Sequence, residues 1–479
     1  MSLRKLMVIN LPNPGQITRR YMCSYVSPES LMPPLELISC AAIARDRHNL
    51  QVELIDAIAE KLTIIQTINR IKQFDPDFVL SLTGFECFEE DMDTMREIRA
   101  KFPEKIFGFF GHYATHFPEQ TLKYSSVDYV ILGEPELVLD TLLSNLNFGL
   151  VKSDLLLEGI AFFKDEEFVK IGSPSRIKDP NELPIPAYDL LPKNGKYYEP
   201  LFSNPYGMIQ TMRGCPYQCN YCVKSYGSKL SQLTVERIIE EIRIWKTLFK
   251  VKSIRFIDDT FTLNKGRTIE LCKAIISNQL NIEWACLSRT DNLDEELLVW
   301  MKNSGCKRIY FGMETGSQRM LDIYKKSVKL EEALQSLLLC RKVGIETAAF
   351  FMSGHPQEEE SDFIETLAFA KAAKLNYASF NPLTPYPGTG LFDQLKHLID
   401  FEIYPYKNRW KDSAIYDNFD SDKLRFYKGF YLRPRYWITN IMVFGKNFFQ
   451  IWKLGIGMLR YLFWDKQFVI SGLKGEKDK

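Results

Sequence analysis

Short apolar segments alternate with amphipathic stretches over the first 150 residues. The expected strands are Leu6–Leu11, Gln51–Ile55, Phe78–Leu82, Ile106–Phe110 and Tyr129–Leu132. The expected helices lie near 35–47, 63–73, 88–101, 117–124 and 135–146. Strands that alternate with helices predict a parallel, doubly wound sheet, whose ligands lie at the carboxyl ends of the strands. We therefore expect ligand-binding residues in the loops 12–30, 83–87, 111–116 and 133–136.

A second alternating series begins near residue 205. Its expected strands are 208–212, 253–257, 283–287, 308–312, 346–352 and 376–381. Six strand–helix units fit a partial parallel barrel better than a second open sheet, although spacing alone leaves both open. Before this series, residues 157–171 predict a hairpin, and six prolines between Pro174 and Pro200 are typical of a linker. The predicted regions are 1–150, 151–204, 205–395 and 396–479.

Composition and charge narrow the class of protein. A chain of 479 residues with 46% hydrophobic and 25% charged residues is globular and suits two or three domains. Lys and Arg number 61 against 60 Asp and Glu, so we expect no nucleic-acid partner. Ten cysteines without a pairing pattern indicate a reducing compartment. Because Pro12 stops the first apolar run, a secretion signal is not indicated, and a cytoplasmic location is expected.

Three of the ten cysteines lie within eight residues. The segment RGCPYQCNYC places Cys215, Cys219 and Cys222 in the spacing CxxxCxxC. Thiolate is a soft ligand, suited to iron–sulfur clusters or zinc. A structural zinc site normally has four protein ligands, and no fourth cysteine or histidine lies nearby. Three ligands on a four-iron cluster leave one iron open for a further ligand.

This motif resembles the signature of radical S-adenosylmethionine (SAM) enzymes, including the aromatic residue, Tyr221, before the third cysteine. The resemblance covers about 205–395. It implies a [4Fe–4S] cluster on Cys215, Cys219 and Cys222, whose open iron is chelated by the amino and carboxylate groups of SAM. One electron, from an external donor of the flavodoxin or ferredoxin type, then cleaves SAM to a 5′-deoxyadenosyl radical.

Further candidates stand at the expected ends of the barrel strands. RFIDDTF resembles the segment that meets the SAM amino group, with Asp258 and Asp259 as candidates. Arg289 of SRTD is a candidate partner of the SAM carboxylate, since a guanidinium matches a carboxylate bidentately. Glu314 of METGSQ is a candidate acceptor for the ribose hydroxyls. Each residue alone also fits an ordinary turn or cap, and their order after the cysteines favours the SAM site. His355, beside a proline, is expected to be structural.

The N-terminal segments GHYATHFPEQTL and VDYVILGEPE resemble the cobalamin-binding domain of cobalamin-dependent radical SAM enzymes. The residues expected near the corrin are Thr83, Gly84, Gly111, His112, Gly133 and Glu134. Glycine lets the backbone approach a large flat cofactor, although plain turns use glycine too. The Asp-x-His-x-x-Gly element that supplies a histidine to cobalt is absent after the first strand. Cobalt is therefore expected to lack a histidine from this loop, unless the domain has lost cobalamin.

A second interpretation of the N-terminal domain is that of a methylthiotransferase, which carries three cysteines for a second cluster. Cys23, Cys40 and Cys87 invite it. Cys40, however, lies in the apolar helical pattern LISCAAIA, where a buried thiol is the ordinary outcome. The chain also shows no basic RNA-binding module at its C-terminal end.

The C-terminal region turns aromatic and basic. Between Trp437 and Trp464, Lys446, Lys453 and Arg460 recur every seven residues among apolar side chains. These charges interrupt any 18-residue apolar span, so a transmembrane helix is not expected. A basic amphipathic helix over 437–464, at the inner face of the cytoplasmic membrane, fits better. A helix packed on the barrel is the alternative. FYLRPRYW resembles members of the family that act on lipids and tetrapyrroles.

The fold class expected is α/β: a doubly wound, Rossmann-like parallel sheet, a partial (β/α)6 barrel and a helical C-terminal region. The resemblance implies a class B-like, cobalamin-dependent methyltransferase related to hopanoid- and tetrapyrrole-modifying members. In that mechanism the deoxyadenosyl radical removes a hydrogen from an unactivated carbon of a lipophilic substrate. The carbon radical takes the methyl group of methylcobalamin, which a second SAM regenerates. Alternatives are anaerobic cyclisation or ring rearrangement of a tetrapyrrole or hopanoid-like lipid, and a non-catalytic cobalamin- or lipid-binding protein, against which the intact cysteines argue.

Overall fold

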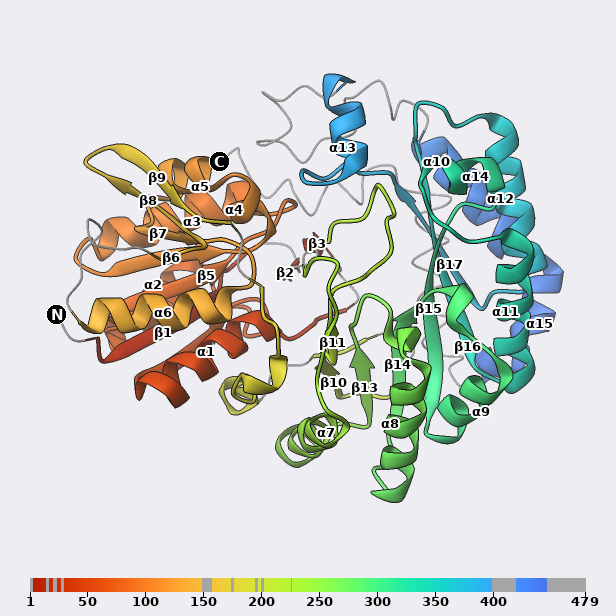
Figure 1. Cartoon of the computed structure of the whole chain (residues 1–479), viewed down its shortest axis with the longest axis horizontal. Coiled ribbons are helices and arrows are strands. Elements are labelled where there is room, and N and C mark those ends of the chain that lie inside the picture. Colours follow the sequence, from red (N-terminus) through yellow and green to blue (C-terminus); the bar gives the residue numbers. More distant parts are fainter. Residues whose placement is uncertain are drawn as a thin grey trace, which may run out of the picture. The chain divides into compact units, whose positions relative to one another are not determined.

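The chain forms two compact units in its computed structural model (Figure 1). The first is built mainly from 1–199 and 224–251, and the second from 200–223, 252–404 and 409–479. The structure describes residues 3–13, 17–19, 24–26, 30–148, 157–173, 176–193, 197–199, 202–224, 226–398 and 419–445.

A seven-stranded sheet is the centre of the first unit, with the order β4-β1-β5-β6-β7-β8-β9. Its parallel part consists of β1 (Lys5–Asn10), β4 (Gln51–Asp56), β5 (Phe78–Leu82), β6 (Ile106–Phe110) and β7 (Tyr129–Ile131). This doubly wound arrangement confirms the expected fold class. A separate antiparallel pair joins β2 (Ile17–Arg19) and β3 (Ser24–Val26).

The hairpin expected over 157–171 completes this sheet. It consists of β8 (Ile160–Lys164) and β9 (Glu167–Ile171), and β8 pairs antiparallel with β7. The sheet therefore continues past residue 150, where the sequence analysis ended the first region. The physical reason is burial: Ile160, Ala161 and Phe162 are almost fully buried, and β8 satisfies the main-chain groups at the edge of β7.

Helices cover both faces of the sheet, as its buried strands require. On one face α1 (Leu35–His48) packs against α6 (Pro135–Asn147) (Figure 1). The other carries α2 (Ile64–Phe74), α3 (Phe88–Lys101), the short α4 (His112–His116) and α5 (Pro118–Ser125). The first unit also holds α7 (Val235–Phe249), whose buried Glu241 accepts a hydrogen bond from the Tyr188 hydroxyl at 2.7 Å.

Six parallel strands in chain order form the second unit, which confirms the expected partial barrel. They are β10 (Tyr206–Ile209), β13 (Ser253–Phe256), β14 (Glu283–Ser288), β15 (Cys306–Glu314), β16 (Glu346–Ser353) and β17 (Tyr377–Pro382). The helices around them are α8 (Lys265–Ser277), α9 (Glu295–Asn303), α10 (Gln318–Ile323), α11 (Leu330–Val343) and α12 (Glu360–Ala372). The carboxyl ends of all six strands share one edge, where the sequence analysis placed the SAM site.

Beyond α13 (Gly390–Leu395), α14 (Phe419–Tyr431) lies along β17 (Figure 1). The Tyr431 hydroxyl accepts the N–H of Ala378 and donates to its carbonyl, both at 2.8 Å. The Tyr427 hydroxyl accepts the N–H of Phe380 at 3.3 Å. Tyrosine hydroxyls thus take the place of a seventh strand at this edge.

The last described helix, α15 (Pro434–Gly445), covers only the start of the amphipathic helix expected over 437–464. Residues 446–464, with all three repeating cations, lie outside the described residues. Tyr436 is buried and donates to the carbonyl of Asn376 at 2.6 Å, whereas Trp437 and Ile438 are exposed. None of the described helices is long and apolar enough to cross a membrane.

Candidate functional site

The loop after β10 brings three free thiols to the carboxyl edge of the barrel. The pKa of two of these thiols, Cys215 and Cys222, is raised, first by burial and then by neighbouring negative charges. These charges include Cys219 for Cys215, and both other cysteines for Cys222. Three thiolates there need a positive partner, and thiolates are the usual ligands of iron–sulfur clusters. Among the described residues no three His, Cys, Asp or Glu side chains could surround a single metal ion. A four-iron cluster needs a wider spacing, because each cysteine binds a different iron.

Asp258 holds the start of this loop. Its carboxylate accepts the N–H groups of Thr211 and Met212 at 2.6 and 2.9 Å, together with the Thr211 hydroxyl. Burial raises the pKa of Asp258 to about 6, against these hydrogen bonds, which lower it. Arg267 reaches the same turn by donating to the carbonyl of Thr211 at 2.9 Å. Asp258 was a candidate for the SAM amino group, but the two main-chain N–H groups take its Oδ1 and the Thr211 hydroxyl takes its Oδ2.

Asp259 is the other member of the pair and faces the cysteines. Its charge raises the pKa of both Cys215 and Cys222, although burial is the larger cause for each. Burial, and then the charge of Asp258, raises the pKa of Asp259 to about 7. Its carboxylate makes no hydrogen bond or ion pair with the residues that the structure describes. A cation such as an ammonium group stabilises the charged form of a buried carboxylate that has no other partner.

Arg289, at the end of β14, is also close to the cysteines. Its Nη1 lies 3.7 Å from the Cys219 sulfur, and its guanidinium stacks 3.6 Å from the centre of the Tyr217 ring. The Asp291 carboxylate accepts hydrogen bonds from Nε and Nη2 of Arg289 at 2.9 and 2.6 Å. Burial lowers the pKa of Arg289, but the Asp291 carboxylate raises it above its usual value. The bidentate ion pair that was expected between Arg289 and the SAM carboxylate is therefore formed with Asp291 instead.

Glu314 ends β15 in a strained position and belongs to a buried network. Its φ of +68° accompanies a register shift between β15 and β16. Its Oε1 accepts from the Tyr221 hydroxyl at 3.0 Å and from the Lys326 ammonium at 2.9 Å. Lys326 also donates to the carbonyl of Gly312, where a Cβ would lie 2.5 Å from the Glu314 carboxylate. The residue before the third cysteine is thus tied to the end of β15.

Asn220, which no sequence motif marks, holds the cysteine loop in place through hydrogen bonds. Asn220 donates through its main chain to Tyr324 at 3.1 Å and through its amide to Ile323 at 3.0 Å. Its carbonyl accepts the N–H of Leu391 at 2.8 Å. Such partners are a hundred or more residues apart in the chain, so spacing gives no signal of them. His355 is buried against Tyr324 and accepts the N–H of Gln357 at 3.1 Å, as a structural histidine does.

In the first unit the selected residues follow three neighbouring strands, β5, β6 and β7. The Thr115 hydroxyl joins two of these ends, because it donates to the carbonyl of Gly111 at 2.8 Å and accepts the N–H of Gly133 at 3.1 Å. Gly111 has a φ of +115°, and a Cβ there would lie 2.2 Å from the carbonyl oxygen of Thr83. The fold itself therefore requires this glycine, whatever binds nearby. The Thr83 hydroxyl is buried and has no hydrogen-bond partner among the described residues.

Two histidines beside these strand ends are neutral. His112 is buried edge-on against Phe85, with the ring centres 5.1 Å apart, and His116 is 5.0 Å away. Burial, then the neighbouring His116, lowers the pKa of His112 to about 3. Burial, then Lys170, lowers the pKa of His116 to about 4. Gly84 and Glu134 complete the set, and the buried Glu134 carboxylate lies 3.9 Å from the Arg176 guanidinium.

Comparison with known proteins identifies the family. Residues 209–370 match the radical SAM superfamily. An uncharacterised methyltransferase of Pyrococcus horikoshii is 34% identical over 446 residues, which cover 89% of this chain and 94% of that protein. This chain is a radical SAM enzyme of the same family.

Two further comparisons extend this result. The anaerobic magnesium-protoporphyrin IX monomethyl ester cyclase of Cereibacter sphaeroides is 24% identical over 376 residues, which cover 77% of this radical SAM enzyme and 60% of the cyclase. The radical SAM methyltransferase TsrM of Kitasatospora setae has the same fold, with a TM-score of 0.69 over 82% of this chain and 76% of TsrM, at 16% identity. That match includes both units.

The cysteines that suggested a methylthiotransferase are not arranged as a second cluster site. Cys40 is fully buried in α1, on one face of the first sheet. Cys87 precedes α3, on the opposite face, and donates to Asp91 at 3.2 Å. Cys23 lies outside the residues whose side chains are described. Because the sheet separates Cys40 from Cys87, these two thiols cannot ligate one cluster in this radical SAM enzyme.

Proposed function

We propose that this radical SAM enzyme is a cobalamin-dependent methyltransferase, acting on an unactivated carbon of a lipophilic substrate. The observation that carries the proposal is the pair of ligand edges, one in each unit. One has thiols and the Asp259 carboxylate, which has no partner among the described residues. The other has aromatic side chains, a neutral His112 ring and the Thr83 hydroxyl, which has no hydrogen-bond partner among the described residues. The Pyrococcus relative is named a methyltransferase, and TsrM has been solved with cobalamin and a [4Fe–4S] cluster bound.

At the barrel edge, Cys215, Cys219 and Cys222 would hold the cluster, which when bound supplies the electron for cleavage of SAM. Asp259 receives the amino group of SAM, because its carboxylate has no hydrogen bond or ion pair with the described residues. Asp258 positions the loop through its hydrogen bonds to the main chain.

Two further residues of the barrel edge have separate tasks. Arg289 lies beside Cys219 and compensates the charge of its thiolate, while Asp291 fixes the guanidinium in place. Glu314 accepts hydrogen bonds from the ribose, and Lys326 orients its carboxylate through their ion pair. An external electron donor of the flavodoxin or ferredoxin type supplies the reducing electron.

In the first unit, Thr83, Gly84, Gly111, His112, Gly133 and Glu134 would line the cobalamin site. Cobalamin carries the methyl group that is transferred. The Thr83 hydroxyl offers a buried hydrogen bond that no described residue takes. His112 presents a neutral ring at pH 7, since its pKa is about 3. A neutral ring beside Phe85 offers a flat macrocycle such as the corrin an apolar contact surface.

Corrinoid retention tests this function. The anaerobically reconstituted full chain is incubated with hydroxocobalamin, and bound corrinoid and iron are measured after gel filtration. We expect one corrinoid per chain, and a Thr83→Val, His112→Leu double variant that retains the iron but little corrinoid. Cys340→Ala, a buried change in α11, is the control. Absence of any corrinoid in the wild-type enzyme would exclude methyl transfer by cobalamin.

The cyclase relative supports a second candidate, anaerobic cyclisation or ring rearrangement of a tetrapyrrole or hopanoid-like lipid. This chain covers 60% of that cyclase, so the activity of the whole cyclase is a proposal here. The two candidates differ in the fate of the SAM methyl group. Transfer of deuterium-labelled methyl to a product supports methylation, whereas 5′-deoxyadenosine without methyl transfer supports the second candidate.

We also propose that the enzyme works in the cytoplasm, at the inner face of the membrane, through 437–464. Exposed Trp437 and Ile438 in α15 support this location. Reversal of Lys446, Lys453 and Arg460 to Glu is expected to release the protein from anionic vesicles. Three cations contribute roughly 3 kcal/mol, over a hundredfold in partitioning. Unchanged flotation of the triple variant would disprove the role of this segment.

A further inference from the structure

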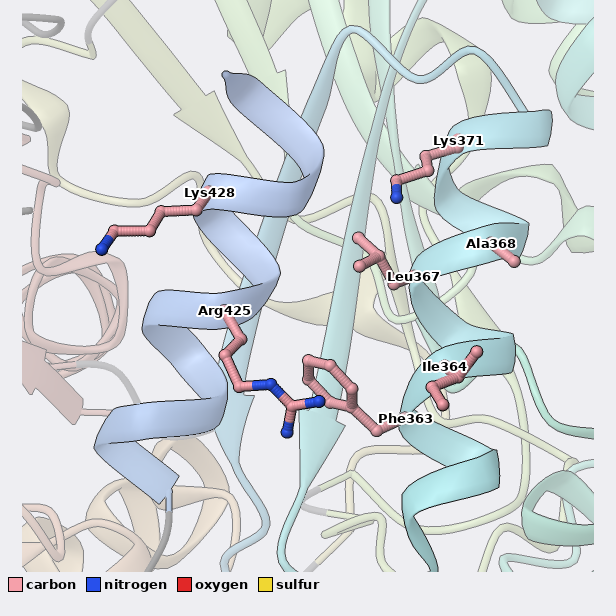
Figure 2. Close-up of a pocket in the computed structure, with 7 residues that line it drawn as sticks. All are labelled: Phe363, Ile364, Leu367, Ala368, Lys371, Arg425 and Lys428. Atoms are coloured by element: carbon pink, nitrogen blue, oxygen red, sulfur yellow. The ribbon is translucent and has the colours of Figure 1, made fainter. Parts of the chain in front are cut away.

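A groove of about 490 Å³ lies on the outer layer of the second unit, between α12 and α14 (Figure 2). Its apolar surface comes from α12. Phe363 is buried, Leu367 is partly buried, and Ile364 is 56% exposed. At Gly429 of α14 a Cβ would lie 2.7 Å from Leu367, so the two helices are in close contact beside the groove. The groove is formed by helices of the outer layer, not by the strand ends proposed for catalysis.

The cations that line the groove differ in whether a carboxylate pairs with them. Arg425 is paired with Glu360 and, at 2.9 Å, with Asp422, so carboxylates offset its charge. Lys371 has no hydrogen bond or ion pair with the described residues, and the positive charge of Arg433 faces it. Figure 2 shows the Lys371 ammonium directed between the two helices, above Leu367, whereas Lys428 extends away from α12. The apolar surface thus ends at Lys371, a cation that forms no ion pair with a described carboxylate.

Exposed apolar side chains continue from this groove along the same layer. Leu432 directly follows α14, and Trp437 and Ile438 lie in α15; they are 43%, 46% and 71% exposed. Large apolar side chains exposed near one another indicate an interaction surface more often than a solvated one.

We propose that this groove binds one anionic phospholipid of a bilayer, with the phosphate at Lys371 and an acyl chain against Ile364 and Leu367. Charge selects this occupant. The segment 446–464 carries Lys446, Lys453 and Arg460 and no acid, so it has the same sign as Lys371 and leaves that charge uncompensated. A neutral apolar partner leaves it uncompensated as well. A phosphodiester compensates it, and the volume suits a headgroup with part of one chain. This inference goes beyond the proposed function, because it concerns a site outside the catalytic edges.

Two matched pairs of variants of the full chain test the site. Lys371→Ala removes the cation, and Lys72→Ala removes an exposed lysine of α2 as its control. Ala368→Trp fills the groove without a change of charge, and Ala372→Trp places the same ring on the same helix beyond it. Binding is measured by flotation with phosphatidylglycerol-containing and pure phosphatidylcholine vesicles. Calorimetry with monomeric dihexanoylphosphatidylglycerol gives the stoichiometry, and inorganic phosphate is the second ligand tested.

We expect one short-chain lipid per chain and no competition from inorganic phosphate at equal concentration. Lys371→Ala is expected to weaken binding about fivefold, the factor for one cation at an anionic surface. Ala368→Trp is expected to weaken it on the order of tenfold, while both controls bind as the wild type does. Equal binding by all four variants, no binding by the wild type, or equal binding of phosphate would each overturn the site. Iron content and SAM cleavage, measured in the same variants, report separately on the proposed function.

Discussion

The two units present the same edge of a parallel sheet, but the two edges differ in charge. The barrel edge collects three thiols, the carboxylates of Asp259 and Glu314 and the cations Arg289 and Lys326. The edge of the first sheet holds a buried hydroxyl, two neutral imidazoles and a single buried carboxylate, that of Glu134. Topology places both edges, since parallel strands end together. The loops decide which groups each edge presents: several charged side chains in the barrel, and mainly uncharged ones in the first sheet.

The two edges also stabilise their polar groups differently. At the barrel edge, two of the charged groups have an ion-pair partner within the chain: Lys326 for Glu314, and Asp291 for Arg289. In the first sheet, burial lowers the pKa of the histidines until they carry no charge at pH 7. Removal of a partner should therefore affect the barrel edge strongly, whereas protonation of the two histidines should affect the edge of the first sheet.

The largest effect is expected at the cysteines. Alanine at Cys215, Cys219 or Cys222 should abolish formation of 5′-deoxyadenosine, because each thiolate would hold a different iron. The measurement is product formation by chromatography, together with an iron assay that should give about four irons per chain in the wild type. Cys87→Ala is the control and should leave the iron count unchanged. Loss of further iron in this control would revive the second-cluster interpretation.

A smaller effect is expected for the partner of Glu314. Lys326→Met should lower the free energy of unfolding by about 3 kcal/mol, because the buried carboxylate loses its ion pair. Denaturant unfolding measures this, and Lys325→Met, at the exposed neighbouring position, is the matched control. Adding Glu314→Gln to Lys326→Met should recover much of the loss. If the two lysine variants are equally stable, Lys326 does not hold Glu314.

The two neighbouring aspartates should separate in their effects. Asp259→Asn should weaken SAM binding ten- to a hundredfold, about 1.5–3 kcal/mol, and leave the iron content intact. Asp258→Ala should lower the iron content, because the main-chain N–H groups of Thr211 and Met212 lose their acceptor. Equilibrium binding of SAM and the iron assay distinguish them. The same loss of SAM affinity in both variants, with normal iron, would contradict the separate roles.

The smallest effect is expected on acidification. His112 has a pKa of about 3 in the folded chain, against about 6.5 when unfolded, so at pH 5 the unfolded chain binds the extra proton. The free energy of unfolding should therefore fall as the pH decreases from 6.5 towards 3, by about 2 kcal/mol at pH 5 from this residue. His112→Phe should remove that part of the pH dependence, and exposed His397→Gln should not. Parallel curves for wild type and His112→Phe would show that His112 is not buried and neutral.

Local patterns were sufficient to predict most of the fold. The ends of β5 and β6 agree with the expected Phe78–Leu82 and Ile106–Phe110 to the residue, because continuous apolar runs mark buried parallel strands. The hairpin of β8 and β9 was also predicted, but not its pairing with β7, because pairing depends on an edge formed elsewhere in the chain.

The candidate site was predictable as far as residue type and order along the chain allow. The cysteines, Asp259 and Glu314 are at the barrel edge, as expected. Which of two adjacent aspartates faces the cysteines depends on the alternation of side chains after β13, and sequence alone left both open. Lys326 was missed because its partner lies twelve residues away across a turn, without a motif that marks it.

The tyrosines of α14 give the barrel a specific vulnerability. Tyr427 and Tyr431 occupy main-chain groups of Ala378 and Phe380 that a neighbouring strand would otherwise take. A chain that ends before residue 419 would leave this row of donors and acceptors open along β17. Such a row is a template for strands of other molecules, so the shortened protein should self-associate edge to edge and precipitate during expression. Shortened versions made for crystallisation should therefore retain α14.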